Sequence, residues 1–484
     1  MNNNHFKWDG PLIQSLEIII DIVLIFTGFF IALTIQEGQI ILTLEQAIEY
    51  LTSFYIPLIL YGLLNIVLFR TYHTTITKRT FLSVVYRLGV ALIISTMFVL
   101  LVTLVFYEIA VIQTAFFILA LFIQIIILTI FKFFLGKFLK KVNIKNAVII
   151  GPQQEVDEIV KKFTDADNAY IKLKYVVYDD LFNNGDLSKV HQFLESVDLV
   201  YLTTNLNDEN KNRIITYCYK NLKTFYLIPR LYELSVNNAR TNQVSDILMY
   251  EVPALQLSLE QKFVKRLFDV FTSLIGLIIT SPIMIFIAIA IKIQDKGKIF
   301  YKQERMTRGN KVFTLYKFRT MIEDAEAKTG PVLAGASDNR ITKLGNFLRK
   351  VRLDELPQLF NILKGEMSVV GPRPEREFFI NQFVEENPAY QYRLNVKTGV
   401  TGVAQTLGTY NTSFEEKLRF DIYYITNYSF LKDISIILHT IRALFDPNSS
   451  KGVEDNQSLE THLNNNGYFL IATEVNFIKA LVKR

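Results

Sequence analysis

Four long apolar runs in the N-terminal part of the chain most constrain what it can fold into. They cover residues 15–35, 47–69, 84–106 and 109–135. Each approaches or exceeds the roughly 20 residues that a helix needs to cross the hydrocarbon core of a bilayer. A buried soluble core is the alternative, but four such runs with consistently charged connections favour membrane helices. The sequence therefore predicts a four-helix transmembrane domain over residues 1–141.

Basic residues in the connections predict the direction of these helices. Arg70, Lys78 and Arg79 lie between the second and third runs, and several lysines follow the fourth run, whereas the other two connections contain neither Lys nor Arg. By the positive-inside rule, both ends of the bundle are expected to be cytoplasmic. The N-terminus also lacks the basic cluster and small-residue cleavage site of a secretory signal, so the first run is expected to be retained as an anchor.

Two carboxylates, Glu17 and Asp21, lie inside or beside the first apolar run. A carboxylate within a membrane segment is a functional candidate by default. Near a helix end it can instead reach back to the lipid headgroups, and this second interpretation is preferred here.

Residues 142–258 have the pattern of a Rossmann-like α/β domain. Short β-branched runs at 147–150, 173–178, 198–202 and 224–228 alternate with helical stretches at 155–163 and 208–221, which favours a parallel sheet. The first strand ends in Gly151-Pro152, and no G-x-G-x-x-G turn follows it, so a dinucleotide site is not supported. A structural, regulatory or oligomerising role is expected.

A fifth apolar run, within a segment of about residues 266–292, is predicted to enter the membrane and return on the same side. Basic residues flank it at both ends, and both flanks prefer the cytoplasm. Ser281-Pro282 lies in its middle, and a proline there kinks or breaks a helix. The Ser281 and Ser273 hydroxyls are candidates to bind the freed carbonyls. An ordinary kinked fifth span is the alternative.

An adjacent acidic pair, Asp354-Glu355, carries the candidate chemistry. Pro357 suits the first turn of a helix and Gly365 suits its end, so a helix over residues 355–364 is expected with Asp354 at its amino end. The macrodipole at that end favours a carboxylate and a bound phosphate. Two adjacent carboxylates that converge on one site need a cation, and hard oxygen ligands suit Mg²⁺. Asp354 and Glu355 are therefore the expected Mg²⁺ ligands.

Basic side chains near this pair are candidates to bind a diphosphate. Arg349 and Arg352 precede it, and Arg373 follows within Gly371-Pro372-Arg373-Pro374. A guanidinium presents paired donors to phosphate oxygens, and the flanking prolines restrict the backbone around Arg373.

Residues 261–445 resemble the catalytic domain of the monotopic polyprenyl-phosphate phosphoglycosyltransferases. The motifs that carry the resemblance are Lys265-Arg266-x-x-Asp269, Ser281-Pro282, Lys317-Phe318-Arg319, Leu353-Asp354-Glu355-Leu356-Pro357-Gln358 and Gly371-Pro372-Arg373-Pro374. Four spans followed by a Rossmann-like domain are similar to the long members of the family, which start capsule, exopolysaccharide or O-antigen synthesis. The resemblance implies a mainly helical catalytic domain over residues 259–446 with a re-entrant helix, facing the cytoplasm at the bacterial cytoplasmic membrane.

The resemblance also implies a mechanism. Asp354 would attack the sugar-bearing phosphate of a UDP-sugar, release UMP and form an aspartyl phosphosugar, which undecaprenyl phosphate would then intercept. Glu355 would position the metal or handle the acceptor proton, while Lys317, Arg319 and the three arginines would bind substrate phosphates. Glucose is slightly preferred over galactose. A homodimer is left open, and no nucleic-acid partner is expected.

Helices expected at residues 414–427 and 431–445 suit either the headgroup layer or ordinary packing. Residues 447–484 match no recognised pattern and are expected to form a loose tail with a short amphipathic end near residues 477–481. Two rival functions are a membrane-anchored nucleotide-sugar dehydratase or epimerase, which requires a dinucleotide turn, and a non-catalytic scaffold for polysaccharide assembly. Neither explains the joint occurrence of the hairpin, the acidic pair and the arginines.

Overall fold

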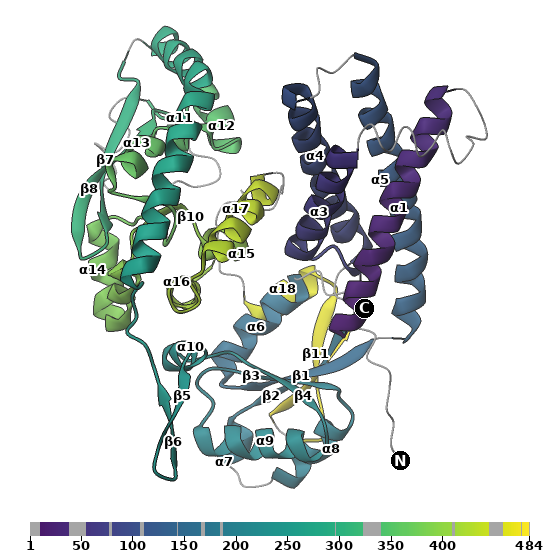
Figure 1. Cartoon of the computed structure of the whole chain (residues 1–484). Helices are drawn as coiled ribbons and strands as arrows, with labels where there is room; N and C mark the ends of the chain where they lie inside the picture. The colour runs from purple at the N-terminus through teal and green to yellow at the C-terminus, as the bar shows by residue number, and fades with distance from the viewer. Residues whose placement is uncertain are drawn as a thin grey trace. The chain divides into compact units, whose positions relative to one another are not determined.

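The computed structural model divides the chain into two compact units (Figure 1). One contains Met1–Ile228 with Asn456–Arg484, and the other contains Pro229–Asp455. The structure describes residues 10–37, 55–76, 80–106, 111–142, 144–165, 170–183, 187–295, 297–322, 340–408, 412–444, 458–475 and 477–483.

Apolar helices form the N-terminal part of the first unit. They are α1 (Pro11–Glu37), α3 (Tyr55–Tyr72), α4 (Phe81–Phe106) and α5 (Val111–Val142). Among the described residues, α1, α4 and α5 are long and apolar enough to cross a membrane, and so is α11 (Leu259–Asp295) of the second unit. The described part of α3 is shorter, and residues 47–54 of the predicted second run lie outside the described residues. The chain is thus a membrane protein with four apolar helices of spanning length.

A buried ion cluster corrects the expectation that Glu17 and Asp21 reach the headgroups. Lys132 of α5 lies 2.6 Å from Glu17 Oε1 and 2.7 Å from Asp21 Oδ2, and all three side chains are buried. Glu17 Oε1 also accepts a hydrogen bond from the Ile76 backbone N–H. A charge in an apolar bundle requires a partner, and Lys132, about 110 residues away in the chain, supplies it.

A parallel sheet follows the bundle, as the sequence predicts. Its strands β2, β1, β3 and β4 lie side by side in that order and pair in parallel. The bounds are β1 (Lys145–Gly151), β2 (Ile171–Tyr178), β3 (Leu199–Leu202) and β4 (Thr224–Leu227), with helices α6 (Gln153–Asp165), α7 (Asp180–Asn183), α8 (Leu187–Glu195) and α9 (Asp208–Lys220).

Side chains of the protein lie at the carboxyl edge of β1 and β3, where such sheets bind nucleotides. A Cβ on Gly151 would lie 1.9 Å from Thr203 Oγ1, so β1 and the end of β3 are in close contact there. Glu155, in the first turn of α6, accepts hydrogen bonds from the backbone N–H and the amide of Asn205. A carboxylate therefore lies at the helix end that would hold a pyrophosphate in a dinucleotide-binding fold.

The C-terminal segment corrects the expectation of a loose tail. Strand β12 (Ile478–Lys483) pairs antiparallel with β2, and β11 (Tyr468–Ala472) pairs with β12, which extends the sheet to six strands. Helix α18 (Leu459–Asn465) packs against α6. Ile478 and Leu481 are buried, and the added strands satisfy the otherwise open edge of β2. Residues 447–457 lie outside the described residues.

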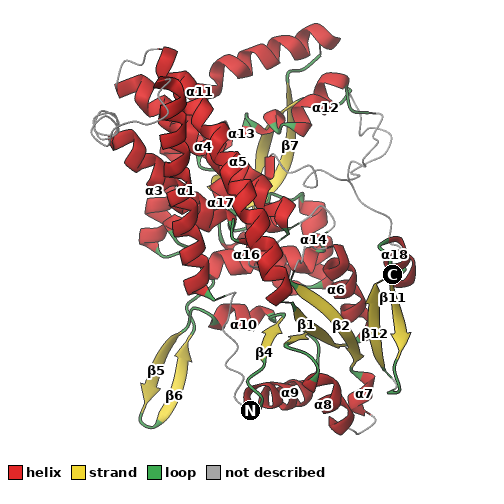
Figure 2. Cartoon of the chain, turned by 90° about the vertical axis from the view of Figure 1, so that its right-hand side faces the viewer, coloured by secondary structure: helices red, strands yellow, loops and turns green. Residues whose placement is uncertain are grey.

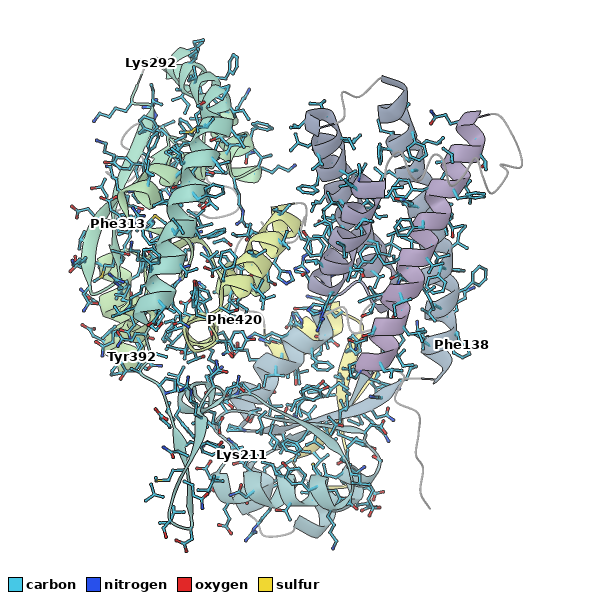
Figure 3. All side chains as sticks on the ribbon, in the orientation of Figure 1. Phe138, Lys211, Lys292, Phe313, Tyr392 and Phe420 are labelled. Atoms are coloured by element: carbon cyan, nitrogen blue, oxygen red, sulfur yellow. The ribbon has the colours of Figure 1, made fainter. Side chains whose placement is uncertain are left out.

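The second unit packs short strands and helices beside the long helix α11. In chain order these other elements are α10 (Leu231–Val236), β5 (Arg240–Val244), β6 (Ile247–Glu251), β7 (Phe300–Thr307), β8 (Lys311–Phe318), α12 (Lys343–Lys350), the 3-10 turn η2 (Leu353–Glu355), α13 (Gln358–Lys364), β9 (Ser368–Val370), α14 (Glu377–Glu386), η3 (Pro388–Asn395), β10 (Gly399–Thr401), α15 (Val403–Leu407), α16 (Phe414–Thr426) and α17 (Phe430–Leu444). Phe313 of β8 is buried beside Ile362 and Met367, and Figure 3 shows it between Lys292 of α11 and Tyr392 of η3.

Helix α11 is continuous through Pro282, and its two ends run in different directions (Figure 2). Pro282 has no N–H to donate to the carbonyl of Ile278, one turn earlier. The Ser281 hydroxyl donates to that carbonyl at 2.9 Å, as the sequence predicts. Ser273 instead donates to Val270. That α11 enters the membrane and returns on the same side stays a prediction.

Candidate active site

The acidic pair lies on a tight turn between two helices. Arg352 adopts a left-handed conformation with φ of 56°, after which Asp354 and Glu355 lie in the 3-10 turn η2. Pro357 then caps α13, and Gly365 ends it with φ of 86°. The helix expected over residues 355–364 therefore begins later, at Gln358, and Glu355 lies in the separate 3-10 turn. This turn holds Asp354 in a position where its side chain is only 8% exposed.

Two predicted phosphate-binding residues contact Glu355. Lys317 Nζ lies 2.8 Å from Glu355 Oε1, and an Arg373 guanidinium nitrogen lies 3.4 Å from the same oxygen. Burial alone would raise the pKa of Glu355, but these two cations outweigh it and hold that pKa at about 2. Glu355 is therefore ionised throughout the physiological pH range.

Asp354 has a different electrostatic environment. Burial raises the pKa of Asp354 above its usual range, and the Glu355 carboxylate adds to the rise, while the cations of Lys317 and Arg349 oppose it. A carboxylate with little water around it and few strong partners is more reactive toward an electrophile than a solvated one. The two neighbouring acids thus differ in their suitability as a nucleophile.

Arg349 and Arg319 occupy different surroundings. Arg349 of α12 donates from Nε to Thr320 Oγ1 at 2.8 Å, and its charge acts on Asp354. Arg319 is buried against Gly297, where a Cβ would lie 2.1 Å from its guanidinium. The Arg319 backbone N–H donates to the Ile299 carbonyl at 3.0 Å, which fixes the residue beside the segment that follows α11. The structure therefore groups Lys317, Arg349 and Arg373 with the two acids and leaves Arg319 beside the end of α11.

Arg373 lies in a loop that is held by contacts which the sequence did not reveal. Buried Arg393 donates to the Arg373 carbonyl at 3.1 Å and is paired with Asp421 at 2.9 Å. The Gly371 N–H donates to the Thr401 carbonyl, and a Cβ on Gly371 would lie 2.3 Å from the Lys397 carbonyl. The only sequence signal for this close approach was the glycine itself.

The Lys265-Arg266-x-x-Asp269 motif fastens α11 to the catalytic unit. Lys265 pairs with Asp433 of α17 at 2.7 Å. Asp269 accepts hydrogen bonds from the Ser368 hydroxyl and the Val369 N–H of β9. Arg266 donates to the carbonyls of Ile362 and Leu363 in the last turn of α13, where the Ile362 carbonyl also accepts from the Gly365 N–H. Through these contacts the motif fixes α13, and so the turn that precedes it.

Asn361 is a further residue that sequence reasoning missed. Its side chain is fully buried, accepts from the Tyr316 N–H and donates to the Thr314 carbonyl of β8. It therefore sets the register between α13, which follows Glu355, and β8, which carries Lys317. A polar residue on the inner face of a helix was the only available signal.

The residue types at the pair fit a hard divalent cation. Among the residues that the structure describes, no group of three His, Cys, Asp or Glu side chains is placed to hold a metal. Mg²⁺ typically uses one or two carboxylates together with waters and substrate phosphates. Burial is the main cause of the raised pKa of Asp354, and a cation bound beside it would stabilise the ionised carboxylate.

Comparison with known proteins gives the family. The family model described as "Bacterial sugar transferase" matches residues 260–447. The chain is 37% identical over 214 residues to an Aeromonas hydrophila UDP-N-acetylgalactosamine-undecaprenyl-phosphate N-acetylgalactosaminephosphotransferase, covering 44% of this chain and 48% of that protein. It is 33% identical over 254 residues to a Klebsiella pneumoniae UDP-glucose:undecaprenyl-phosphate glucose-1-phosphate transferase, covering 51% and 54%. The chain thus spans about half the length of these two relatives.

A third relative is matched over most of its length. It is the exopolysaccharide production protein ExoY of Sinorhizobium fredii, 36% identical over 194 residues, which are 37% of this chain and 84% of that protein. The region that the family model matches, residues 260–447, contains the acidic pair, its cations and the motif that fastens α11. The chain therefore belongs to the bacterial sugar transferase family of polyprenyl-phosphate phosphoglycosyltransferases.

Proposed function

We propose that this protein transfers a hexose-1-phosphate from a UDP-sugar to undecaprenyl phosphate and releases UMP, with UDP-glucose or UDP-galactose as the expected donor. The reaction would be the first membrane step of exopolysaccharide or capsule synthesis, at the cytoplasmic face of the bacterial inner membrane. The observation that carries the proposal is buried Asp354 beside a Glu355 that is held by Lys317 and Arg373.

The first step forms a covalent intermediate on Asp354. A carboxylate oxygen attacks the phosphorus that bears the sugar, an Asp354–phosphate bond forms, and the bond from that phosphorus to the bridging oxygen breaks, so UMP leaves with the electron pair. Lys317, Arg349 and Arg373 can stabilise the charge on the transferring phosphoryl oxygens and on the leaving group. Mg²⁺ at Asp354 and Glu355 would neutralise the diphosphate charge.

The second step returns the carboxylate. A phosphate oxygen of undecaprenyl phosphate attacks the same phosphorus, the diphosphate linkage to the lipid forms, and the Asp354–phosphate bond breaks. The acceptor remains in the bilayer and the donor remains in water, so the site has to lie at the boundary between them. The apolar helix α11, which Lys265, Arg266 and Asp269 fasten to the unit, supports this location.

A second donor is favoured by one relative. The A. hydrophila protein is named for UDP-N-acetylgalactosamine, so an N-acetylated donor is the alternative to a plain hexose. A panel of UDP-glucose, UDP-galactose, UDP-N-acetylglucosamine and UDP-N-acetylgalactosamine, scored by UMP release from membranes with Mg²⁺, separates them. The highest kcat/KM with an N-acetylated donor would replace the hexose assignment.

Asp354→Asn tests the covalent step. We expect the variant to insert into membranes normally, to release UMP at least about 10³-fold more slowly, and to retain no label from a donor carrying ³²P in the sugar-bearing phosphate, because the amide is a poor nucleophile. The wild type should retain the label in the absence of acceptor and lose it when undecaprenyl phosphate is added. Turnover of the variant at the wild-type rate would refute the assignment.

A further inference from the structure

Three segments of the second unit meet around the Thr307 hydroxyl. Thr307 Oγ1 donates to the Glu366 carbonyl at 2.9 Å and lies 3.3 Å from Thr398 Oγ1. The residues adjacent to these three, namely Arg308, Gly365 and Lys397, are therefore brought together at the end of α13. This end lies away from the acidic pair, because a seven-residue helix extends for about 10 Å.

The cationic groups of Arg266 and Lys397 both lie close to Gly365. A Cβ on this glycine would lie 3.4 Å from the Arg266 guanidinium and 3.5 Å from Lys397 Nζ. Arg266 is fixed there by its hydrogen bonds to the carbonyls of Ile362 and Leu363. Lys397 is partly buried, and neither it nor Arg308 forms an ion pair with a carboxylate in the part of the chain that the structure describes.

The carboxylates near this cluster are already engaged. Asp433 is paired with Lys265, and Asp269 accepts two hydrogen bonds from β9. Burial lowers the pKa of Lys397, and the charges of Arg266, Arg308 and Lys265 add to this effect while Asp269 opposes it. A partly buried ammonium surrounded by other cations is destabilised, and an anion would remove the cost.

An apolar stripe of α11 runs beside the cluster. Phe263, Leu267, Phe271, Leu274 and Ile278 are all exposed, each by about half or more, and their spacing of three or four residues places them on one face. Arg266 is three residues after Phe263 on the same helix, so this cation borders the stripe. A ligand that fits both features has an anionic head and long apolar chains.

We propose that Arg266, Arg308 and Lys397 bind the phosphate headgroup of an anionic membrane phospholipid whose acyl chains lie along this α11 stripe. The site is separate from the acidic pair, so the phospholipid is a bound component and not the acceptor. It would hold the first half of α11 at a fixed depth while the transfer chemistry proceeds at the other end of α13.

Native mass spectrometry of the full chain in detergent tests the proposal. The probes are dioleoyl-phosphatidylglycerol, dioleoyl-phosphatidylcholine, undecaprenyl phosphate and inorganic phosphate. We expect tight binding of one phosphatidylglycerol, and a loss of affinity of about thirtyfold in Arg308→Gln/Lys397→Gln, because each cation near an anionic lipid contributes separately. Lys172→Gln/Lys220→Gln removes the same charge from two exposed lysines elsewhere and should bind like the wild type.

Thermal unfolding of the same proteins distinguishes binding from damage to the fold. Without lipid, Arg308→Gln/Lys397→Gln should melt at or above the wild-type temperature, because the substitutions relieve repulsion. Phosphatidylglycerol should raise the melting temperature of the wild type and not that of this variant. If the double variant does not fold, the single variant Lys397→Gln is used in both the binding and the unfolding measurements.

Four results would overturn the proposal. They are unchanged phosphatidylglycerol affinity in the double variant, equal affinity for phosphatidylcholine, equally tight binding of inorganic phosphate, and displacement of phosphatidylglycerol by an equal concentration of undecaprenyl phosphate. The last would assign the cluster to the acceptor. Because the readout is binding, a failure here is independent of UMP release.

Discussion

Two adjacent carboxyl groups, Asp354 and Glu355, have opposite electrostatic environments. Glu355 is held ionised by Lys317 and Arg373, whereas burial and the Glu355 charge raise the pKa of Asp354. Such a separation is typical of sites in which two titratable groups have different roles. It supports assigning the nucleophile to Asp354 and a fixed negative charge to Glu355.

The pH dependence of UMP release should depend on these neighbours. Asp354 has to be ionised to attack, so activity is lost as the pH falls through its raised pKa. Lys317→Met removes a cation that lowers this pKa, and the acid limb of kcat/KM should move to higher pH. Glu355→Gln removes a negative charge that raises the pKa of Asp354, so the acid limb of kcat/KM should move to lower pH. Shifts of the same sign in both variants would contradict this account.

The sequence predicted Lys317 and Arg319 as members of one phosphate-binding group, but the structure places only Lys317 beside the acidic pair. Lys317 and Arg319 are two residues apart, which would place them on one face of a continued strand. Strand β8 ends at Phe318, however, and Arg319 lies against Gly297. Asn361 and Arg393 were not predicted because a buried polar residue is recognised by its partners, and several of these lie 28 or more residues away along the chain.

At the scale of elements, hydrophobic length predicted the helices of the bundle, but not how they pair. Glu17 and Asp21 of α1 share Lys132 of α5, so one cation serves two carboxylates. Glu17 Oε2 and Asp21 Oδ1 have no hydrogen-bond partner in the described structure. This pairing depends on which faces of α1 and α5 meet, which the apolar composition of both helices does not specify.

The bundle should be far more sensitive to loss of the cation than of either acid. Lys132→Met leaves two buried carboxylates unpaired and should lower the free energy of unfolding by about 3–5 kcal/mol. Asp21→Asn leaves one matched pair and should change it by less than about 1 kcal/mol. Thermal melting in detergent measures both, and a combined Lys132→Met/Glu17→Gln/Asp21→Asn variant should recover part of the loss. Equal effects of the two single substitutions would refute the pairing.

At the scale of the whole molecule, the sheet of the first unit takes strands from before and after the second unit in the chain. The first four strands were predicted from their β-branched runs and the helices between them. Strands β11 and β12 were not, because their pairing with β2 joins residues about 300 positions apart. Local sequence pattern contains no information about that contact.

Ile478 tests whether these strands support the sheet. Ile478→Ser removes a buried side chain opposite Val177 and should destabilise the first unit by about 3 kcal/mol. Ile471→Ser, at a half-exposed position of β11, should change stability by less than about 0.5 kcal/mol. Protease resistance of the sheet domain measures this difference, and UMP release should persist in both variants. Similar protease resistance in the two would show that β12 is dispensable.

The order of strands along the chain has a consequence for synthesis. Because the catalytic unit is inserted between β4 and α18, the ribosome completes it before the last two strands of the surrounding sheet exist. Until then, the edge of β2 is available to other chains. Strand β12 can therefore pair with β2 only after the intervening catalytic unit has been translated. A prematurely terminated chain would leave the edge of β2 unpaired and exposed to the quality-control machinery of the cell.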